Sequence, residues 1–416
     1  MSKRTGLRVE HPCPQCGGPV NLDEADRFFE CGFCRVRLCI APKDFMRYII
    51  PPKRLEAHDL VFVPYWRFRG KSFTVLPYKV NQSMLDTSFR AVEHSFMPGT
   101  LGLRTQTQAL RFASPEMDAS FLSSDVPYSK IHESAELILR LHRDPPGERV
   151  FHRAFIGETI SKVFAPVYLK GNGLFDALLE RPIAHLDFKR KEAIKGAGKL
   201  KRWKLKFLPA QCPRCGWDLE GHSDNVVFIC RNCDSAWLLA RGKFKNIPFA
   251  VVKARASDAY YAPFWRIKAS VEGLCASSYA DIIRLANLPK AIRAAWEEED
   301  MYFWFPGLKV NPRAFLRLSR IVTLARPGML FKDRARPEFR RAQLGPVNVS
   351  PDEAAQALTT LLASIAVRKK DLYPRLKDVR VKAEGMQLYF FPFVRQGSDY
   401  VQPAINFSLN RSSFRS

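Results

Sequence analysis

Eight of the ten cysteines in this chain of 416 residues stand in Cys-x-x-Cys pairs, which form two sets of four. The first set is Cys13, Cys16, Cys31 and Cys34, and the second is Cys212, Cys215, Cys230 and Cys233. A Cys-x-x-Cys turn places two sulfurs on one side of a knuckle, and the glycine after the first pair permits the positive φ angle that this knuckle needs. Two knuckles complete a tetrahedron around a metal ion at about 2.3 Å per sulfur, leaving no position for water or substrate. Each set therefore predicts one structural zinc ion.

Short β-prone runs, residues 27–30 and 226–229, lead into the second knuckle of each set. This layout resembles the zinc-ribbon family over residues 11–40 and 210–240, with all four ligand positions matched. The resemblance implies zinc held by four cysteines. Rubredoxin-type iron sites use similar knuckles, but their second knuckle usually also reads Cys-Pro-x-Cys-Gly, which both sets lack, so zinc is the expected metal.

The repetition extends beyond the cysteines, since the second set follows the first at an offset of 199 residues. Pro64 and Trp66 recur at the same offset as Pro263 and Trp265, and we interpret both tryptophans as core residues. Two further pairs of segments are similar at larger offsets: residues 96–99 with 304–307 (offset 208), and residues 164–169 with 390–394 (offset 226). The chain is therefore predicted to be an internal duplication.

Helical segments are expected at residues 129–143, 281–300 and 350–369. Ser350 can cap the last of these, with Pro351 at its first position, and Pro289 is expected to kink or divide the second. The strands that contain an aromatic-Pro-aromatic run are expected at a sheet edge, a strand start or a bulge, because proline cannot donate to a β-ladder.

The predicted fold class is α+β: two tandem copies of a small zinc ribbon followed by an antiparallel β-rich body with one main helix. The predicted domains are zinc ribbon 1 (1–45), β-rich body 1 (46–187), a basic linker (188–207), zinc ribbon 2 (208–245) and β-rich body 2 (246–416). A ribbon followed by a Val-Pro-Tyr-Trp-x-Phe strand also resembles, more loosely, uncharacterised bacterial zinc-ribbon proteins. Some of these carry names taken from the primosomal helicase, but no Gly-x-x-x-x-Gly-Lys-Ser/Thr loop is present to support a helicase.

The formal net charge of +25 is spread over both halves of the chain and predicts attraction to polyanions. The candidate contacts are basic residues on the ribbons, in the linker and in one stretch of the second body: Arg35, Arg37, Arg214, Arg231, Arg241, Lys201, Arg202, Lys204, Arg313, Arg317 and Arg320. The last three have i, i+4, i+7 spacing, so they share one face if that stretch is helical. If it is a strand, Arg313 and Arg317 still share a side.

No catalytic motif is found, and we do not expect an enzyme or a small-molecule substrate. His11 and His222 lie near the ribbons but are expected to be neighbouring or surface residues, because four cysteines already fill each shell. With no export signal, the protein is expected to be cytoplasmic, where disulfides are rare, and Cys39 and Cys275 are expected to be small buried residues.

Three kinds of partner fit the sequence. The first is a protein bound by a non-enzymatic, zinc-dependent scaffold or adaptor. The alternatives are nucleic acid, bound by an accessory protein, and an anionic membrane surface, bound peripherally. Replacing Cys13 by serine is expected to release one zinc ion and leave the second site metallated if the two ribbons are independent.

Overall fold

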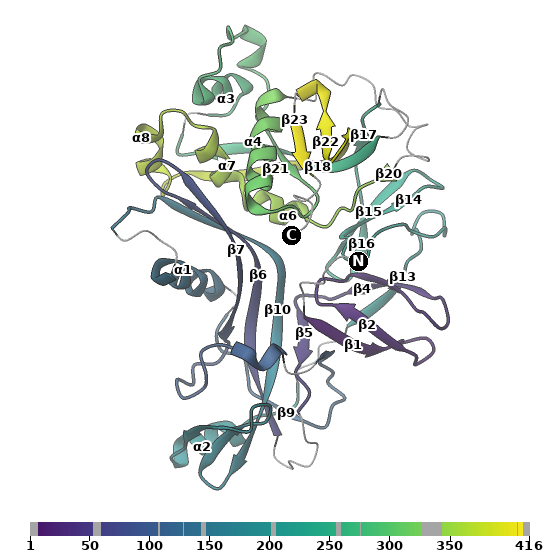
Figure 1. Cartoon of the computed structure of the whole chain (residues 1–416), viewed down its shortest axis with the longest axis vertical. Helices are drawn as coiled ribbons and strands as arrows, with labels where there is room; N and C mark the ends of the chain where they lie inside the picture. Colours follow the sequence, from purple (N-terminus) through teal and green to yellow (C-terminus); the bar gives the residue numbers. More distant parts are fainter. Residues whose placement is uncertain are drawn as a thin grey trace.

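The computed structural model describes residues 7–52, 60–106, 109–127, 129–142, 147–200, 205–254, 259–274, 276–326, 343–405 and 407–410. The fold is mixed and consists mostly of strands, with fewer helices (Figure 1). Two large sheets and two small ones account for the strands of these residues. No helix in the described ranges is long and apolar enough to cross a membrane.

The first large sheet carries most of the N-terminal half of the chain. Its strands are β1 (Arg8–Pro12), β2 (Pro19–Asp23), β5 (Met46–Ile49), β6 (Leu60–Val75), β7 (Val80–Arg90), β8 (Leu110–Phe112), β9 (Ser120–Phe121), β10 (His152–Lys170), β11 (Gly173–Asp176) and β12 (Pro182–His185). The long strands β6 and β10 are antiparallel to each other, and β7 lies antiparallel to β6 on its other side. These three strands form the long, curved part of the sheet at the centre of Figure 1.

The second large sheet carries most of the C-terminal half. Its strands are β17 (Phe249–Val251), β18 (Tyr260–Glu272), β19 (Tyr302–Pro306), β20 (Gln343–Leu344), β21 (Arg380–Gln396), β22 (Asp399–Gln402) and β23 (Phe407–Asn410). Here β18 is antiparallel to β21 and β19. Both sheets also contain short parallel pairs, β5 with β10 and β6 with β9 in the first, and β17 with β21 and β18 with β20 in the second. The bodies are therefore mixed sheets, not purely antiparallel ones as the sequence suggested.

The two small sheets belong to the ribbons. One contains β3 (Phe28–Glu30), β4 (Arg37–Ala41) and β13 (Lys206–Pro209), and the other contains β14 (Val227–Cys230), β15 (Ser235–Ala240) and β16 (Lys243–Ile247).

Prolines lie inside the long strands without breaking them. The prediction of edge, start or bulge positions is wrong, because β6, β10, β18 and β21 all have neighbours on both sides. On the side away from its long partner, Pro64 lies between the last β7 pairing, at Tyr65, and the last β9 pairing, at Phe62. Pro263 lies in the same way between the β19 and β20 pairings. At such a gap, a missing backbone N–H costs the sheet no ladder hydrogen bond.

The helices that cover the second sheet outnumber those on the first within the described ranges, so a single main helix per body is not what the structure has. The helices are α1 (Lys130–His142), α2 (Phe188–Lys195), α3 (Tyr279–Ala286), α4 (Pro312–Ala325), α6 (Pro351–Ala355), α7 (Leu358–Ile365) and α8 (Lys369–Leu372). The helix expected at 129–143 is confirmed as α1, and the stretch with the three arginines is the helix α4.

Two of the expected helices are shorter than predicted. The segment 350–369 begins with the expected cap, in which Ser350 and Glu353 exchange hydrogen bonds, but it divides into α6 and α7 at Gln356 and Ala357. The segment 281–300 is α-helical only in α3, which ends at Ala286 and has Asn287, in a left-handed conformation, as its C-cap two residues before Pro289. A short 3-10 helix, Ala294–Trp296, follows later in the segment.

The basic segment 188–207 also has regular structure. Its first part is α2, capped by the Asp187 side chain, which accepts a hydrogen bond from the backbone of Arg190. Its end enters β13, which pairs with β4 of the first ribbon. A linker or exposed strand was expected here because of the glycines, and these lie after the helix, at Gly196 and Gly198.

The C-terminal part of β6 and the N-terminal part of β10 pack against the second body. At Gly70 an added Cβ would lie 2.1 Å from the Ile156 carbonyl oxygen, so the two strands approach each other too closely there for a side chain. Beyond this point Phe73 contacts Phe315 of α4, with ring centroids 6.1 Å apart. Phe73 and Ile156 belong to the same buried cluster as the core of the second sheet. The two bodies therefore share a core.

Candidate metal centres

Each ribbon forms its two knuckles by local backbone hydrogen bonds. In the first knuckle of ribbon 1, the Gly17 N–H donates to the Cys13 carbonyl at 2.8 Å, and Gly17 adopts φ +74°. Gly216 and Cys212 repeat this contact at 2.8 Å with φ +73°. A side chain is strained at such a φ, which explains why both first knuckles end in glycine.

The four sulfurs of each set converge. In ribbon 1 the Sγ atoms of Cys13 and Cys34 are 3.9 Å apart, and those of Cys16 and Cys31 are 3.7 Å apart. All four sulfurs of each set lie within 4.8 Å of one another. A tetrahedron with metal–sulfur bonds of about 2.3 Å has edges of about 3.8 Å, so the spacing fits one zinc ion.

Ribbon 2 has the same geometry. The Sγ atoms of Cys212 and Cys233 are 3.6 Å apart, and those of Cys215 and Cys230 are 3.5 Å apart. These distances are far longer than the disulfide bond of about 2.05 Å, and the described cysteines are free thiols. The two clusters could each hold one metal ion, with Cys13, Cys31, Cys212 and Cys230 buried.

Some thiols within these clusters differ in acidity. Hydrogen bonds from the backbone N–H groups of Cys34 and Phe33 lower the pKa of Cys31 to about 6. A hydrogen bond from the backbone N–H of Trp217 lowers the pKa of Cys215 to about 6. Burial, with the hydrogen bond to Cys215, raises the pKa of Cys230 to about 12. A bound divalent cation would favour the thiolate form of all four sulfurs.

Ser235 was not recognised from the sequence as part of a site. Its Oγ lies 3.1 Å from the sulfur of Cys233 and 3.7 Å from that of Cys212, and it accepts a hydrogen bond from the Trp237 indole N–H at 2.8 Å. The residue at the matching position of ribbon 1 is Val36. The repeat therefore carries no signal for this contact.

The two neighbouring histidines do not belong to the clusters. His11 stacks on Phe207, with ring centroids 5.2 Å apart, and burial lowers its pKa. Neither His11 nor His222 is within either group of converging ligand atoms.

The two ribbons pack directly against each other. The Arg27 and Phe28 N–H groups of ribbon 1 both donate to the Ser223 carbonyl of ribbon 2, at 2.6 and 2.8 Å. Phe28 also contacts Phe228, with ring centroids 5.9 Å apart. One buried cluster joins Phe28 and Cys39 to Cys212 and Cys230 of the second site. Cys39 is thus a buried residue, as expected, and lies at this interface; Cys275 lies outside the described residues.

Ribbon 1 is attached to the first sheet by a buried ion pair. Glu24, which is fully buried, accepts hydrogen bonds from Arg67 of β6 at 2.8 and 2.9 Å. Asp86 of β7 binds the other side of the same guanidinium at 2.7 Å. Removing one partner of such a pair would leave a buried charge without compensation, which typically costs about 3–5 kcal/mol.

Ribbon 2 is attached to the second body in a different way. The Val226 N–H donates to the Val347 carbonyl at 2.8 Å, and Asp224 binds Lys309 and Asn348 at 3.1 and 2.8 Å. Both clusters are therefore fixed to a large sheet as well as to each other.

The predicted polyanion contacts on the ribbons fall into two groups. Arg37 and Arg231 are engaged by carboxylates, with Arg37 3.3 Å from Asp218 of the other ribbon and Arg231 2.7 Å from Glu220. Arg214 and Arg241 are exposed, as is Arg35, which is 3.6 Å from Glu30. The linker residues Lys201, Arg202 and Lys204 lie outside the described residues.

Comparisons with protein-family models, curated proteins and solved structures gave no match. The interpretation therefore rests on the geometry of this chain.

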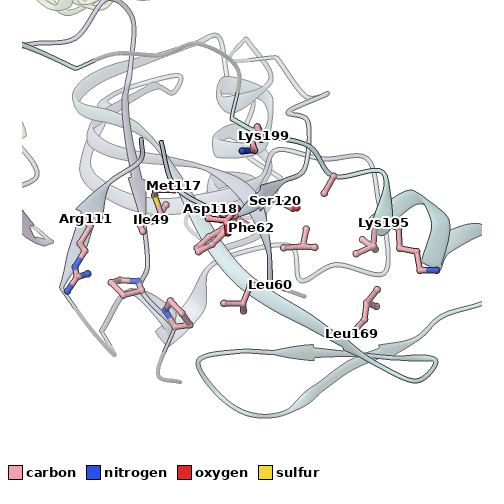
Figure 2. Close-up of a pocket in the computed structure, with 16 residues that line it drawn as sticks. Ile49, Leu60, Phe62, Arg111, Met117, Asp118, Ser120, Leu169, Lys195 and Lys199 are labelled. Carbon is pink, nitrogen blue, oxygen red and sulfur yellow. The ribbon is translucent and has the colours of Figure 1, made fainter. Parts of the chain in front are cut away.

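The described residues form at least three concave surfaces away from the cysteines. One has a volume of about 840 Å³ and is drawn in Figure 2, where Phe62 and Leu60 lie near its centre and Arg111, Lys195 and Lys199 lie around it. Another, of about 600 Å³, includes Arg313, Arg317 and Arg320 of α4, and a third, of about 510 Å³, lies at the start of α2. Trp66 and Trp265 line none of these surfaces. Both are buried, as expected, and their indole N–H groups donate to the carbonyls of Val126 and Val349.

Proposed function

We propose that this protein is a non-enzymatic, zinc-dependent scaffold or adaptor that presents a basic surface to a partner. The observation that carries this proposal is the convergence of two four-sulfur clusters at spacings that fit a tetrahedral ion. Four thiolates would leave no open coordination position on zinc, so the metal would serve to hold structure and not to activate a substrate.

An internal duplication is part of this proposal, and the strand pairings support it. The pairs in the first sheet, β6 with β7, β9 and β10, correspond to β18 with β19, β20 and β21 in the second, with the same directions. Pro64 lies opposite Phe164, and Pro263 lies opposite Phe390, in agreement with the sequence offsets of 199 and 226. Each long strand pair also has a register shift that leaves one glutamate without a partner residue in the pairing, Glu158 in β10 and Glu384 in β21.

The match of residues 96–99 with residues 304–307, which was inferred from the sequence, is not supported by the strand pairings. Tyr65 pairs with Arg90, and its counterpart Phe264 pairs with Pro306. The Ala91 N–H donates to the Pro64 carbonyl as the Gly307 N–H donates to the Pro263 carbonyl. Residues 90–91 therefore correspond to 306–307, and the resemblance of residues 96–99 to 304–307 is misleading.

The role of zinc in this proposal is to fix each ribbon to its large sheet and to the other ribbon. Small ribbons contain too little apolar core to be stable alone, so a structural metal supplies much of their folding free energy. Because each ribbon contacts a sheet and the other ribbon, two zinc ions would stabilise the arrangement of both bodies.

The test is partner capture from the native host with matched proteins. We expect the tagged, zinc-loaded protein to capture a partner, and the variant in which Cys13 and Cys212 are both replaced by serine to lose it together with the metal. Capture of the same partner by the metal-free variant would contradict the proposal, as would the absence of any captured macromolecule. If the material captured is RNA or DNA that dissociates steeply with salt, the partner is a nucleic acid and the protein is an accessory factor for it.

A further inference from the structure

A groove of about 600 Å³ lies between α4, the strand β7 of the first body and the segment around α8. Figure 1 shows α4 beside the upper ends of β6 and β7, with α8 next to them. Four cationic side chains line this groove: Arg313, Arg317, Arg320 and Lys369. No carboxylate is among the described residues that line it.

The three arginines are free to bind a ligand. They are exposed on one face of α4, at i, i+4 and i+7, which places them about 6 Å and then about 4.5 Å apart along the helix axis. Among the described residues none of the three forms an ion pair with an acidic side chain. Arg317 also lies over the Phe407 ring, 5.3 Å from its centroid, a contact that restrains the guanidinium.

The floor of the groove is aliphatic. Leu316 is buried there, and Val80, Ile321 and Leu324 are half-buried. The aromatic ring that lines the groove, Tyr373, is buried, and its hydroxyl group donates to the Ala363 carbonyl at 3.3 Å. Single-stranded nucleic acid is typically held by exposed aromatic rings on which bases stack, and the described lining offers none.

An aliphatic floor with an arginine rim fits a peptide that is acidic on one face and apolar on another. Arginine binds carboxylates in a bidentate manner, and an amphipathic helix places its apolar side chains in such grooves at i, i+3, i+4 and i+7. The acidic run of this chain, residues 297–300, is largely used internally. Glu297 forms an ion pair with Arg284, and Asp300 forms one with Lys268. The chemistry therefore favours a different protein over a second copy.

We propose that this groove binds an acidic, amphipathic segment of a partner protein, with carboxylates paired to the arginines of α4 and aliphatic side chains on the floor. This inference rests on the proposed scaffold function and names the class of its partner.

The experiment uses the full-length, zinc-loaded protein and a fluorescent synthetic peptide of 18 residues, with leucine at i, i+3, i+4 and i+7 and glutamate elsewhere on the helix. Binding is followed by anisotropy. Replacing Arg313, Arg317 and Arg320 by glutamate should weaken binding about tenfold or more. The matched control places glutamate at Lys243, Lys245 and Lys253, which are exposed and do not line the groove, and should change affinity by about twofold or less. A peptide with serine for leucine should bind more weakly, since the floor is apolar.

Three results would overturn the inference: no binding at about millimolar peptide, equal losses in the groove and control variants, or groove-dependent binding of a single-stranded DNA 20-mer without binding of the peptide. Zinc content and circular dichroism of each variant report whether it is folded. If the peptide fails while the protein holds two zinc ions and still captures a partner, only the groove assignment is wrong. If the protein holds no zinc, the scaffold proposal itself fails.

Discussion

At the scale of single residues, the sequence predicts the metal clusters well and their surroundings poorly. The cysteine spacing is local information, and the structure brings all eight of these sulfurs into two groups. The partner of Arg37, Asp218, lies 181 residues away in the chain, so no local pattern could show that this arginine is engaged. Ser235 was missed for a related reason, because its contact is absent from the other ribbon.

The first prediction concerns Ser235. Replacing Ser235 by valine, the residue that ribbon 1 has at this position, removes the hydroxyl next to Cys212 and Cys233. Such neighbouring groups typically contribute about tenfold or more to metal affinity. The second site of the variant should therefore lose zinc at about a tenth of the chelator concentration that the parent protein requires. The control is Val36 replaced by threonine, which should leave the second site unchanged. Identical chelator curves for S235V and the parent would show that the hydroxyl has no such role.

At the scale of elements, the aromatic and β-branched runs predict that strands form. They do not predict which part of the molecule each strand packs against. Nothing in residues 60–75 shows that one half of β6 packs in the first body and the other half against α4 of the second. The division of the segment 350–369 into two helices has no proline or glycine at the break and is decided by packing, since Leu358 and Leu361 are buried in the shared core.

The second prediction tests the close approach of β6 and β10. In Gly70→Ala, the new methyl group would meet the Ile156 backbone, which cannot move without disturbing the sheet. Overpacking of this kind typically costs about 1–3 kcal/mol, and thermal or urea unfolding should show the loss. The matched control is Gly385→Ala in β21, where an added Cβ has nothing within 4 Å. Equal stability of the two variants would mean that the strands can separate at Gly70 at no cost.

The third prediction concerns His152, at the start of β10. Burial lowers its pKa to about 4, whereas an unfolded histidine titrates near 6.5. Between these values only the unfolded state binds the proton, so stability falls as the pH drops below 6.5 and levels off below about 4. From pH 7 to pH 5 this contributes a loss of about 2 kcal/mol. His152→Gln should show a correspondingly smaller loss in urea unfolding. Any pH dependence of the eight cluster cysteines is common to both proteins, so the difference between them isolates the histidine, and equal losses would refute this assignment.

At the scale of the whole molecule, the ribbons and bodies are joined more closely than tandem units in a sequence suggest. The repeat offset predicts two similar halves, but contacts between the halves involve residues that face each other only in the folded chain. Phe28 meets Phe228, and Phe73 meets Phe315. The expectation of two independent zinc sites therefore changes: loss of one ion should leave the second bound but more easily removed.

The measurement that tests the central claim most directly is elemental analysis of the purified protein and of its Cys13→Ser variant. The account predicts two equivalents of zinc per chain in the parent and one in the variant, with the remaining ion extracted at a lower chelator concentration than in the parent. Far fewer than two equivalents of zinc in the parent, or iron in its place, would contradict it.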